Sequence, residues 1–255
     1  MPVFLYFVGA AGSGKSSLTH AFKLWMERMG YHAATVNLDP GVAHLPYSPD
    51  IDIREWFVLS EIMEEYGLGP NGAQIVAADL TALRAGEIKA LTDEISSDYF
   101  LIDTPGQMEL FTFRECSSII IKALSEEGSA IVFLYDPMLS STPSSFVSQI
   151  MLGSTTQFRF SIPTINVLSK ADMLDEDRLE TILEWSRNAD ALYDAIIAEA
   201  PSMEGQLNTE LFMALEALGT YKELIPVSSE ALSGMEDLYA VAQQIFMGGE
   251  DLSVD

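Results

Sequence analysis

The residues best suited to chemistry in this sequence lie in a glycine-rich segment, residues 9–16, with the pattern Gly-x-x-x-x-Gly-Lys-Ser. Glycines let backbone N–H groups curl around a phosphate, the lysine can reach the β- and γ-phosphates, and the serine hydroxyl can ligate Mg²⁺. An apolar run precedes the segment and helix-forming residues follow it, which argues against a glycine-rich turn that matches by chance. The pattern predicts that six residues bind the phosphates of a nucleotide: Gly12, Ser13, Gly14, Lys15, Ser16 and Ser17.

An aspartate at the end of a second apolar run could complete a metal site. Residues 99–102 are apolar, and Asp103 follows them in the sequence Asp-Thr-Pro-Gly. In phosphate-loop proteins an acid at this position lies beside the loop and holds Mg²⁺, here together with the Ser16 hydroxyl. Gly106 can bring its backbone N–H close to the γ-phosphate, because it has no side chain. A turn-forming aspartate is the alternative, and the nearby phosphate loop favours the metal-binding interpretation.

A third carboxylate, Asp39, follows the apolar run of residues 33–38 in the sequence Asn-Leu-Asp-Pro-Gly. Near a triphosphate, this side chain could orient the attacking water or accept its proton. A turn formed by Asp-Pro-Gly explains the same residues equally well. The spacing alone leaves both interpretations open.

Ser169, Lys170 and Asp172 resemble the Asn-Lys-x-Asp motif with which GTPases read guanine, with serine in place of the asparagine. The Asp172 carboxylate can accept hydrogen bonds from N1–H and the 2-amino group of guanine, whereas adenine would leave it unpaired. Lys170 can lay its aliphatic stem along the base. The start of a helix is the alternative interpretation. A last loop that contacts the base through backbone N–H groups is expected at two residues after the final apolar run: Ser228 and Ser229.

These motifs need elements that bring them together, and apolar runs alternate with helix-forming stretches along the chain. The run at residues 3–8 is continuous, which indicates a buried parallel strand rather than a signal peptide. Further strands are expected at residues 33–38, 99–102, 130–135, 164–168 and 224–227, and helices at residues 16–29, 110–124, 146–158 and 235–246. The alternation predicts an α/β fold of the P-loop NTPase type, with a doubly wound, mainly parallel sheet and helices on both faces.

Two long segments interrupt the alternation and are expected to be helical insertions, at about residues 42–97 and 175–222. Each contains apolar side chains at near-helical spacing, which we expect to face the core rather than a partner. The chain has no internal repeat and no long linker. We therefore expect residues 1–255 to form a single P-loop GTPase domain.

The charge of the chain restricts its partners. The formal net charge is −25, with only 13 lysines and arginines. Nucleic acid and anionic membranes bind basic groups, so we expect neither direct nucleic-acid binding nor membrane association. No apolar run approaches the ~20 residues that span a bilayer. The single cysteine, Cys116, excludes an internal disulfide, and we expect a cytoplasmic protein.

Together these motifs resemble the GPN-loop GTPase family, and the chain is similar to its short, archaeal-type members. The match also includes Gly-Pro-Asn-Gly at residues 69–72 and Gln-Met-Glu at residues 107–109. The motifs occur in the family's order and span nearly the whole chain. Taken alone, Gly-Pro-Asn-Gly would indicate a β-turn; the surrounding motifs favour the loop that distinguishes this family. Ser169 departs from the guanine motif and leaves the strength of guanine specificity open.

The resemblance implies a Mg²⁺-dependent enzyme that converts GTP to GDP and phosphate as a homodimer. In the family, the loop of one subunit enters the partner's active site, so Asn71 would contact the γ-phosphate region or the leaving phosphate. Asp39 would help hold the Mg²⁺ shell or activate water, and Gln107 would position the attacking water, since an amide donates and accepts. Glu109 is a lesser candidate for the same network. Relatives are associated with RNA polymerase assembly, which implies protein partners of that kind.

No arginine lies at a sequence position that would place it beside the phosphates, where it could neutralise charge in the transition state. Arg54, Arg84 and Arg114 are available, and a surface position is the expected one for each. Catalysis would then depend on Lys15, Mg²⁺ and backbone amides, and we expect slow intrinsic turnover. Two alternatives remain: a P-loop ATPase or small-molecule kinase, and a nucleotide-gated binding module with negligible hydrolysis.

Overall fold

A parallel sheet forms the centre of the computed structural model, which describes residues 2–125, 128–199, 203–219 and 221–248. Its strands are β1 (Val3–Gly9), β2 (Ala33–Asn37), β3 (Ile51–Asp52), β4 (Tyr99–Asp103), β5 (Ser129–Tyr135), β6 (Thr164–Leu168) and β7 (Ile225–Pro226). They are ordered β3-β2-β4-β1-β5-β6-β7, and every pairing is parallel. All residues of the central strands β1, β4 and β5 are buried, so helices must cover both faces.

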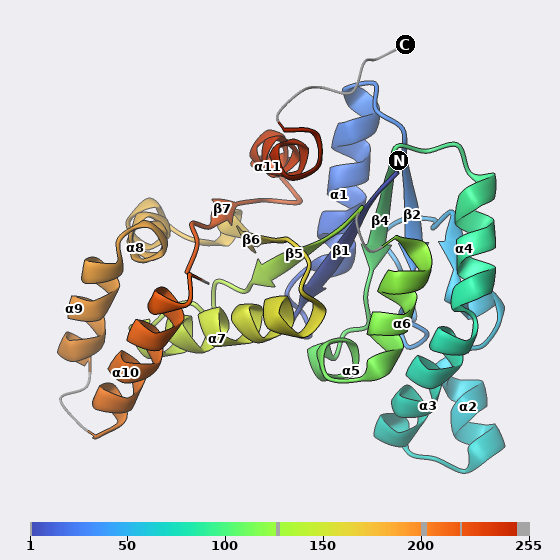
Figure 1. Ribbon diagram of the computed structural model, residues 1–255, viewed down its shortest axis with the longest axis horizontal. Helices are drawn as coiled ribbons and strands as arrows, with labels where there is room; N and C mark the ends of the chain where they lie inside the picture. The colour runs from blue at the N-terminus through green and yellow to red at the C-terminus, as the bar shows by residue number, and fades with distance from the viewer. Residues whose placement is uncertain (1, 126–127, 200–202, 220, 249–255) are drawn as a thin grey trace.

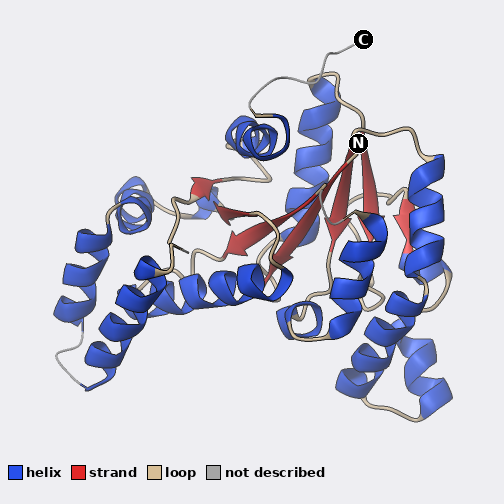
Figure 2. Ribbon diagram, in the orientation of Figure 1, coloured by secondary structure: helices blue, strands red, loops and turns tan. Residues whose placement is uncertain are grey.

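Helices cover both faces of this sheet (Figures 1 and 2). They are α1 (Lys15–Arg28), α2 (Leu59–Tyr66), α3 (Pro70–Leu83), α4 (Ala85–Glu94), α5 (Met108–Thr112), α6 (Glu115–Leu124), α7 (Pro143–Phe160), α8 (Glu176–Arg187), α9 (Ala189–Glu199), α10 (Met203–Ala217) and α11 (Met235–Met247). Helices α1 and α11 lie on one face, and α5, α6 and α7 lie on the other. The structure confirms the predicted α/β fold with a doubly wound parallel sheet.

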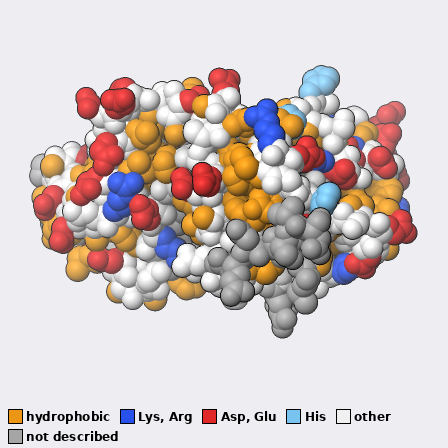
Figure 3. Space-filling view, turned by 90° about the horizontal axis from the view of Figure 1, so that it is seen from above, with side chains coloured by type: hydrophobic (Ala, Val, Ile, Leu, Met, Phe, Trp, Pro, Cys, Tyr) orange, Lys and Arg blue, Asp and Glu red, His pale blue; other side chains and the backbone are white. Residues whose placement is uncertain are grey.

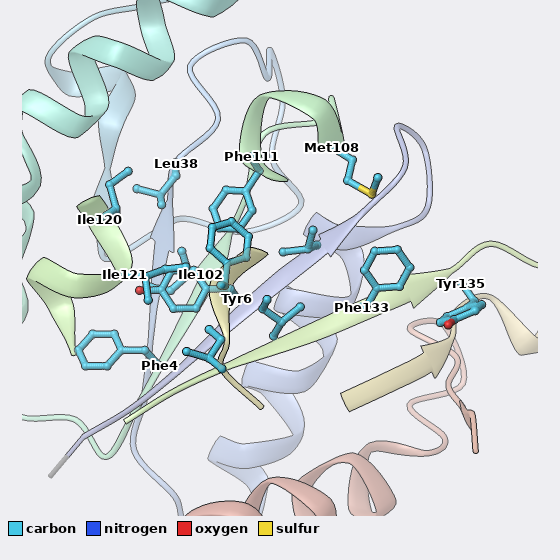
Figure 4. Close-up of a cluster of buried hydrophobic side chains, with 14 of the residues drawn as sticks. Phe4, Tyr6, Leu38, Ile102, Met108, Phe111, Ile120, Ile121, Phe133 and Tyr135 are labelled. Carbon is cyan, nitrogen blue, oxygen red and sulfur yellow. The ribbon is translucent and has the colours of Figure 1, made fainter. Parts of the chain in front are cut away.

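Two hydrophobic clusters, one on each face of the sheet, hold the layers together. The smaller cluster joins alternate residues of the strands, such as Leu5 and Phe7, to Phe22 of α1 and Leu238 of α11. The larger cluster lies on the opposite face, and Figure 4 shows part of it, including Phe4, Tyr6, Leu38, Ile102, Phe111 and Phe133. Because successive side chains of a strand point to opposite faces, β1 contributes to both clusters. The central strand is thereby held rigidly under the loop that follows it.

The structure divides or shifts several of the predicted elements. The helix expected at residues 110–124 is two helices, α5 and α6, because Arg114 has an extended backbone (φ −92°, ψ 151°) at the start of α6. The first insertion contains helices α2 to α4 and also the two-residue strand β3, which its apolar spacing did not indicate. The second insertion consists of helices α8 to α10. The last strand, β7, is only two residues long.

The apolar stripes of the two insertions are only partly core, which corrects our expectation. The predicted first stripe is Trp56, Phe57, Leu59, Ile62, Met63 and Tyr66. Within it Ile62 is buried, but Tyr66 is 51% exposed. The predicted second stripe is Leu211, Leu215 and Leu218. Within it Leu215 packs against the larger cluster, but Leu218 is 62% exposed. Among the α10 side chains that the structure describes, the buried one is Phe212, which lies between Leu211 and Leu215. In each stripe the exposed residue is the last one.

The surface is acidic, and in Figure 3 the red carboxylates outnumber the blue basic side chains across the face in view. This agrees with the formal net charge of −25. Among the described residues, no helix combines the length and the apolar composition that crossing a membrane requires.

Candidate functional site

The loop between β1 and α1 has the geometry of a phosphate cradle. Gly12 and Gly14 adopt left-handed backbone angles (φ 77° and 94°), which glycine takes up at little cost. Gly9 must be glycine for a different reason, since an added Cβ would lie 2.9 Å from the Leu134 carbonyl oxygen of the neighbouring strand. The Ser13 hydroxyl is buried and has no hydrogen-bond partner among the described residues. The loop is thus tightly packed at its base and presents a row of backbone groups at the start of α1.

Lys15 lies at the centre of the site and is only 6% exposed. Its ammonium donates to the carbonyl oxygens of Gly9 and Ala10, each at 3.0 Å, and to that of Gly106 at 3.5 Å. Burial lowers the pKa of Lys15, and the nearby Asp103 carboxylate opposes this effect. The ammonium therefore joins the phosphate loop to the Asp-Thr-Pro-Gly loop, where a phosphate would need a positive charge.

Asp103 ends strand β4 beside this lysine and is 1% exposed. Burial raises the pKa of Asp103 to about 6, against the effect of hydrogen bonds from Ser16 and Tyr47 and of the Lys15 charge. The Tyr47 hydroxyl donates to Asp103 Oδ2 at 3.0 Å. The other oxygen, Oδ1, is buried and makes no hydrogen bond of regular geometry within the described part of the chain. The site thus contains a costly buried carboxylate with an unused acceptor.

Asp39 connects the loop after β2 to the loop after β4. Its Oδ2 accepts the backbone N–H of Gly106 at 3.0 Å, and its Oδ1 accepts that of Gly41 at 2.8 Å. Asn37 fixes the turn from behind, because its Oδ1 accepts the backbone N–H of Asp39 at 3.0 Å and its Nδ2 donates to Asp52 at 2.9 Å. Asp39 therefore forms the Asp-Pro-Gly turn and also faces the phosphate-binding loops. The two interpretations of the sequence do not exclude each other.

The residues present suit a magnesium ion held together with a nucleotide. The Ser16 hydroxyl, the buried Oδ1 of Asp103 and the nearby Asp39 carboxylate provide oxygen ligands, which Mg²⁺ prefers. No group of three or more His, Cys, Asp or Glu side chains in the described residues could hold a metal by itself. A site of this composition needs phosphate oxygens and water to complete the shell, as Mg²⁺ sites in nucleotide hydrolases do.

The segment expected to read the base follows β6 and contacts the phosphate loop through Lys170. The Lys170 ammonium donates to the Gly12 carbonyl oxygen at 2.5 Å and forms an ion pair with Asp136 at 2.9 Å. The Ser169 hydroxyl is buried and donates to the carbonyl oxygen of Tyr135 at 3.0 Å. Ser169 therefore links its own loop to β5. Lys170, which pairs with Asp136, makes the longer connection from this loop to the phosphate loop.

The other residues expected to contact the base lie at the same edge of the sheet. Asp172 is exposed in a single 3₁₀ turn, Ala171–Met173. The backbone N–H of Ala171 donates to the Val227 carbonyl oxygen at 3.0 Å, which places this turn beside the loop that carries Ser228 and Ser229. That loop closes on Gly234, where an added Cβ would lie 2.1 Å from the Pro226 carbonyl oxygen. The structure thus brings Asp172 and both serines to the same side as the phosphate loop.

The Gly-Pro-Asn segment lies apart from these loops. Gly69 precedes helix α3, Pro70 is the first residue of that helix, and Asn71 is exposed. The segment joins α2 and α3 at the outer end of that helix pair (Figure 1). It is therefore the start of a helix rather than an isolated β-turn, with proline at its favoured first position. Within one chain, Asn71 faces solvent.

The remaining candidates have mixed positions. Gln107 is partly exposed directly after Gly106, close to the Asp39 carboxylate that Gly106 binds. The side chain of Glu109 lies outside the described residues, and Ser17 is exposed in the first turn of α1. The three arginines have acidic partners in their own chain: Arg54 with Asp52, Arg84 with Glu87, and Arg114 with Asp79.

Tyr47 and Asp136 also contact the predicted site residues and were not predicted from the sequence. Asp136 directly follows the buried strand β5 and Asp103 is the last residue of β4, so a search for carboxylates at strand ends would have found Asp136. Tyr47 has no comparable signal, because it lies in a loop and its contact with Asp103 spans 56 residues.

Comparisons with known proteins identify relatives of this chain. A family model described as "conserved hypothetical ATP binding protein" matches residues 7–248. The GPN-loop GTPase PAB0955 of Pyrococcus abyssi is 34% identical over 253 residues, which cover 98% of this chain and 100% of that protein. GPN-loop GTPase 1 of Dictyostelium discoideum is 28% identical over 241 residues, covering 93% of this chain and 60% of that protein. The chain therefore spans the whole archaeal relative and about 60% of this eukaryotic one.

The fold comparison agrees with the sequence comparison. The crystal structure of PAB0955 from Pyrococcus abyssi, described as a GTPase in apo form, matches with a TM-score of 0.87. The match covers 96% of this chain and 98% of that one at 34% identity. The two proteins therefore share the same overall fold over nearly their whole length.

Proposed function

The chain belongs to the GPN-loop GTPase family, and on that premise we propose that it binds GTP and hydrolyses it to GDP and phosphate in a Mg²⁺-dependent reaction. The proposed active form is a cytoplasmic homodimer in which the Gly-Pro-Asn segment of each subunit enters the partner's site. A role in assembling a protein complex such as RNA polymerase follows from the family resemblance. The acidic surface is consistent with protein partners rather than nucleic acid.

One observation carries the proposal: the loops that follow four strands are linked to one another by hydrogen bonds around the buried Lys15. Its ammonium bonds to the phosphate loop after β1 and to Gly106 after β4. Asp39, after β2, accepts the N–H of that same Gly106. Lys170, after β6, reaches back to Gly12 in the phosphate loop. Loss of the γ-phosphate would therefore change the contacts of several loops at once, as nucleotide-dependent switching requires.

The chemistry follows from these contacts. On GTP binding, the Lys15 ammonium can exchange its bonds with the Gly9 and Ala10 carbonyls for bonds with phosphate oxygens. Mg²⁺, when bound through Ser16 and Asp103, neutralises part of the phosphate charge. The Asp39 carboxylate and the Gln107 amide lie at the loops where water would attack, and each can orient that water. The Gly106 N–H is available to a γ-phosphate once Asp39 shares it or releases it.

Guanine preference is proposed to come from Asp172. The family model is described by ATP binding, whereas the similar proteins are named GTPases. The Asp172 carboxylate is exposed beside Lys170 and has the acceptors that guanine satisfies and adenine does not. Slow turnover is proposed because Arg54, Arg84 and Arg114 are engaged with carboxylates of their own chain.

Phosphate release from GTP and ATP tests the proposal, measured with Mg²⁺ over a wide range of protein concentration. We expect GTP to be preferred and the specific activity to rise with protein concentration as dimers form. Asn71→Ala should lose hydrolysis and keep nucleotide binding, since Asn71 is exposed and its segment lies at the outer end of the α2–α3 helix pair (Figure 1). Mixing Asn71→Ala with Lys15→Ala should restore partial activity, because each mixed dimer contains one intact composite site.

The alternatives predict different results. Equal hydrolysis of ATP and GTP would favour an ATPase or small-molecule kinase. An unchanged hydrolysis rate in Asn71→Ala would mean that the Gly-Pro-Asn segment only begins a helix. Tight GTP binding without any phosphate release would favour a nucleotide-gated binding module. A fast single-turnover rate without a partner protein would contradict slow intrinsic hydrolysis.

A further inference from the structure

Tyr47 lies in the long loop between β2 and β3 and reaches into the phosphate site. Its hydroxyl donates to Asp103 Oδ2 at 3.0 Å, across 56 residues of sequence. Its ring stacks on His20 of α1, with ring centres 6.0 Å apart and an angle of 16° between the planes. Two elements thus hold this side chain, α1 through the ring and β4 through the hydroxyl.

The loop that carries Tyr47 is anchored on both sides of it. Asp50 accepts the backbone N–H and the hydroxyl of Thr35, at 2.7 and 2.9 Å, and pairs with Lys23 at 2.7 Å. On the other side, Arg54 donates to the Val42 carbonyl oxygen at 3.1 Å. The hydroxyl is therefore held in place by a fixed scaffold rather than by a free loop.

The hydrogen bond from Tyr47 gives the two carboxylate oxygens of Asp103 different surroundings. A tyrosine hydroxyl is a donor at neutral pH, so it fixes the rotation of the carboxylate through Oδ2. Oδ1 is then left buried without a regular hydrogen bond in the described residues. A hydrogen-bond donor behind a metal-binding carboxylate orients it and raises metal affinity, and loss of such a partner typically costs about 10- to 100-fold.

We propose that Tyr47 is a positioning residue for the magnesium site, holding Asp103 so that its second oxygen is available to the metal shell. This inference rests on the proposed Mg²⁺-dependent nucleotide binding. The residue acts through Asp103 and has no contact with the nucleotide assigned to it. Its position on the loop that follows Asp39 also couples that loop to the metal.

The test uses the full chain and Tyr47→Phe, which keeps the ring on His20 and removes only the hydroxyl. The probe is a fluorescent GDP analogue, and the readout is its dissociation rate as Mg²⁺ is titrated from zero with a chelator. We expect the Mg²⁺ concentration for half-maximal slowing to rise about 10-fold in the variant. The Mg²⁺-free dissociation rate and the thermal unfolding temperature should stay as in the wild type. Tyr193→Phe, an exposed tyrosine of α9, is the matched control and should change neither value.

Three results would overturn the inference in distinguishable ways. An unchanged Mg²⁺ dependence in Tyr47→Phe would show that the hydroxyl does not orient the metal site. Tighter Mg²⁺ binding would show that the hydroxyl competes with the metal. If the wild type itself shows no Mg²⁺ effect on GDP release, the proposed Mg²⁺-dependent function fails together with this inference.

Discussion

Replacing Asp103 with asparagine should stabilise the ligand-free protein above pH 7 while it removes the magnesium site. Asp103 is almost completely buried, and one of its oxygens has no regular partner among the described residues. Burial raises its pKa from the ordinary value of 3.8 to about 6, even with Lys15 and two hydroxyl groups favouring the charged form. Holding this carboxylate ionised therefore costs folding free energy at neutral pH.

The pKa difference sets both the size and the pH range of this cost. Between 3.8 and about 6 the folded state binds more protons than the unfolded state, so stability falls as the pH rises through this range. Above it the full penalty is present, about 3 kcal/mol, and below pH 3.8 it is absent. Asparagine has nearly the same shape and cannot ionise, so the variant lacks this part of the pH dependence.

Urea denaturation at a series of pH values measures the effect. We expect the free energy of unfolding of Asp103→Asn, relative to wild type, to rise by about 2.5 kcal/mol between pH 4 and pH 7.5, since a small part of the penalty is already present at pH 4. The exposed Asp98, just before the same strand, provides the control variant Asp98→Asn, which should show no such pH-dependent gain. In the same variant, Mg²⁺ should no longer slow the release of bound GDP.

A pH-independent difference between Asp103→Asn and the wild type would refute this reasoning. It would mean that the carboxylate is not penalised by burial in the folded protein, and that its unused oxygen is paired in solution. A lower stability of the variant at pH 7.5 would have the same meaning.

Two further substitutions test the loops that are expected to surround the guanine base. Asp136→Asn should lower guanine-nucleotide affinity about fivefold in a displacement assay, a modest loss because the Lys170 side chain is about one third exposed; an unchanged affinity would contradict the connection to the phosphate loop. Gly234→Ala should lower the free energy of unfolding, measured by urea denaturation, by about 3 kcal/mol or more. Gly234 has a left-handed backbone (φ 74°), and an added Cβ would lie 2.1 Å from the Pro226 carbonyl oxygen. Gly219→Ala, at φ 69° in open space, should cost only about 1 kcal/mol, and equal losses would refute the steric argument.

Local patterns were enough to identify the parts of the site that lie along one stretch of chain. The phosphate loop is recognisable because its glycines, lysine and serine act on the same phosphates and must be neighbours in sequence. Asp103 and Asp172 are recognisable for a similar reason, since each follows a buried strand. The carboxyl ends of parallel strands meet at one edge of the sheet, so residues at those positions are expected together.

Boundaries were harder to predict where packing overrides local preference. The break between α5 and α6 and the exposed ends of both apolar stripes depend on which neighbour each helix meets. Periodicity reports that a helix has an apolar face, but not how far along the helix that face is covered. Leu218 continues the stripe and is exposed, whereas Phe212 lies off the stripe and is core.

The sequence by itself determined the fold class, the phosphate loop, the strand-end acids and the family resemblance, because these depend on short-range spacing. Only the tertiary structure decided that Tyr47 contacts Asp103, that Asp136 pairs with Lys170 and that Asp39 binds Gly106. These contacts join residues that are 56, 34 and 67 positions apart. No local pattern encodes such pairs, because they exist only after the strand order has brought different loops to the same edge of the sheet.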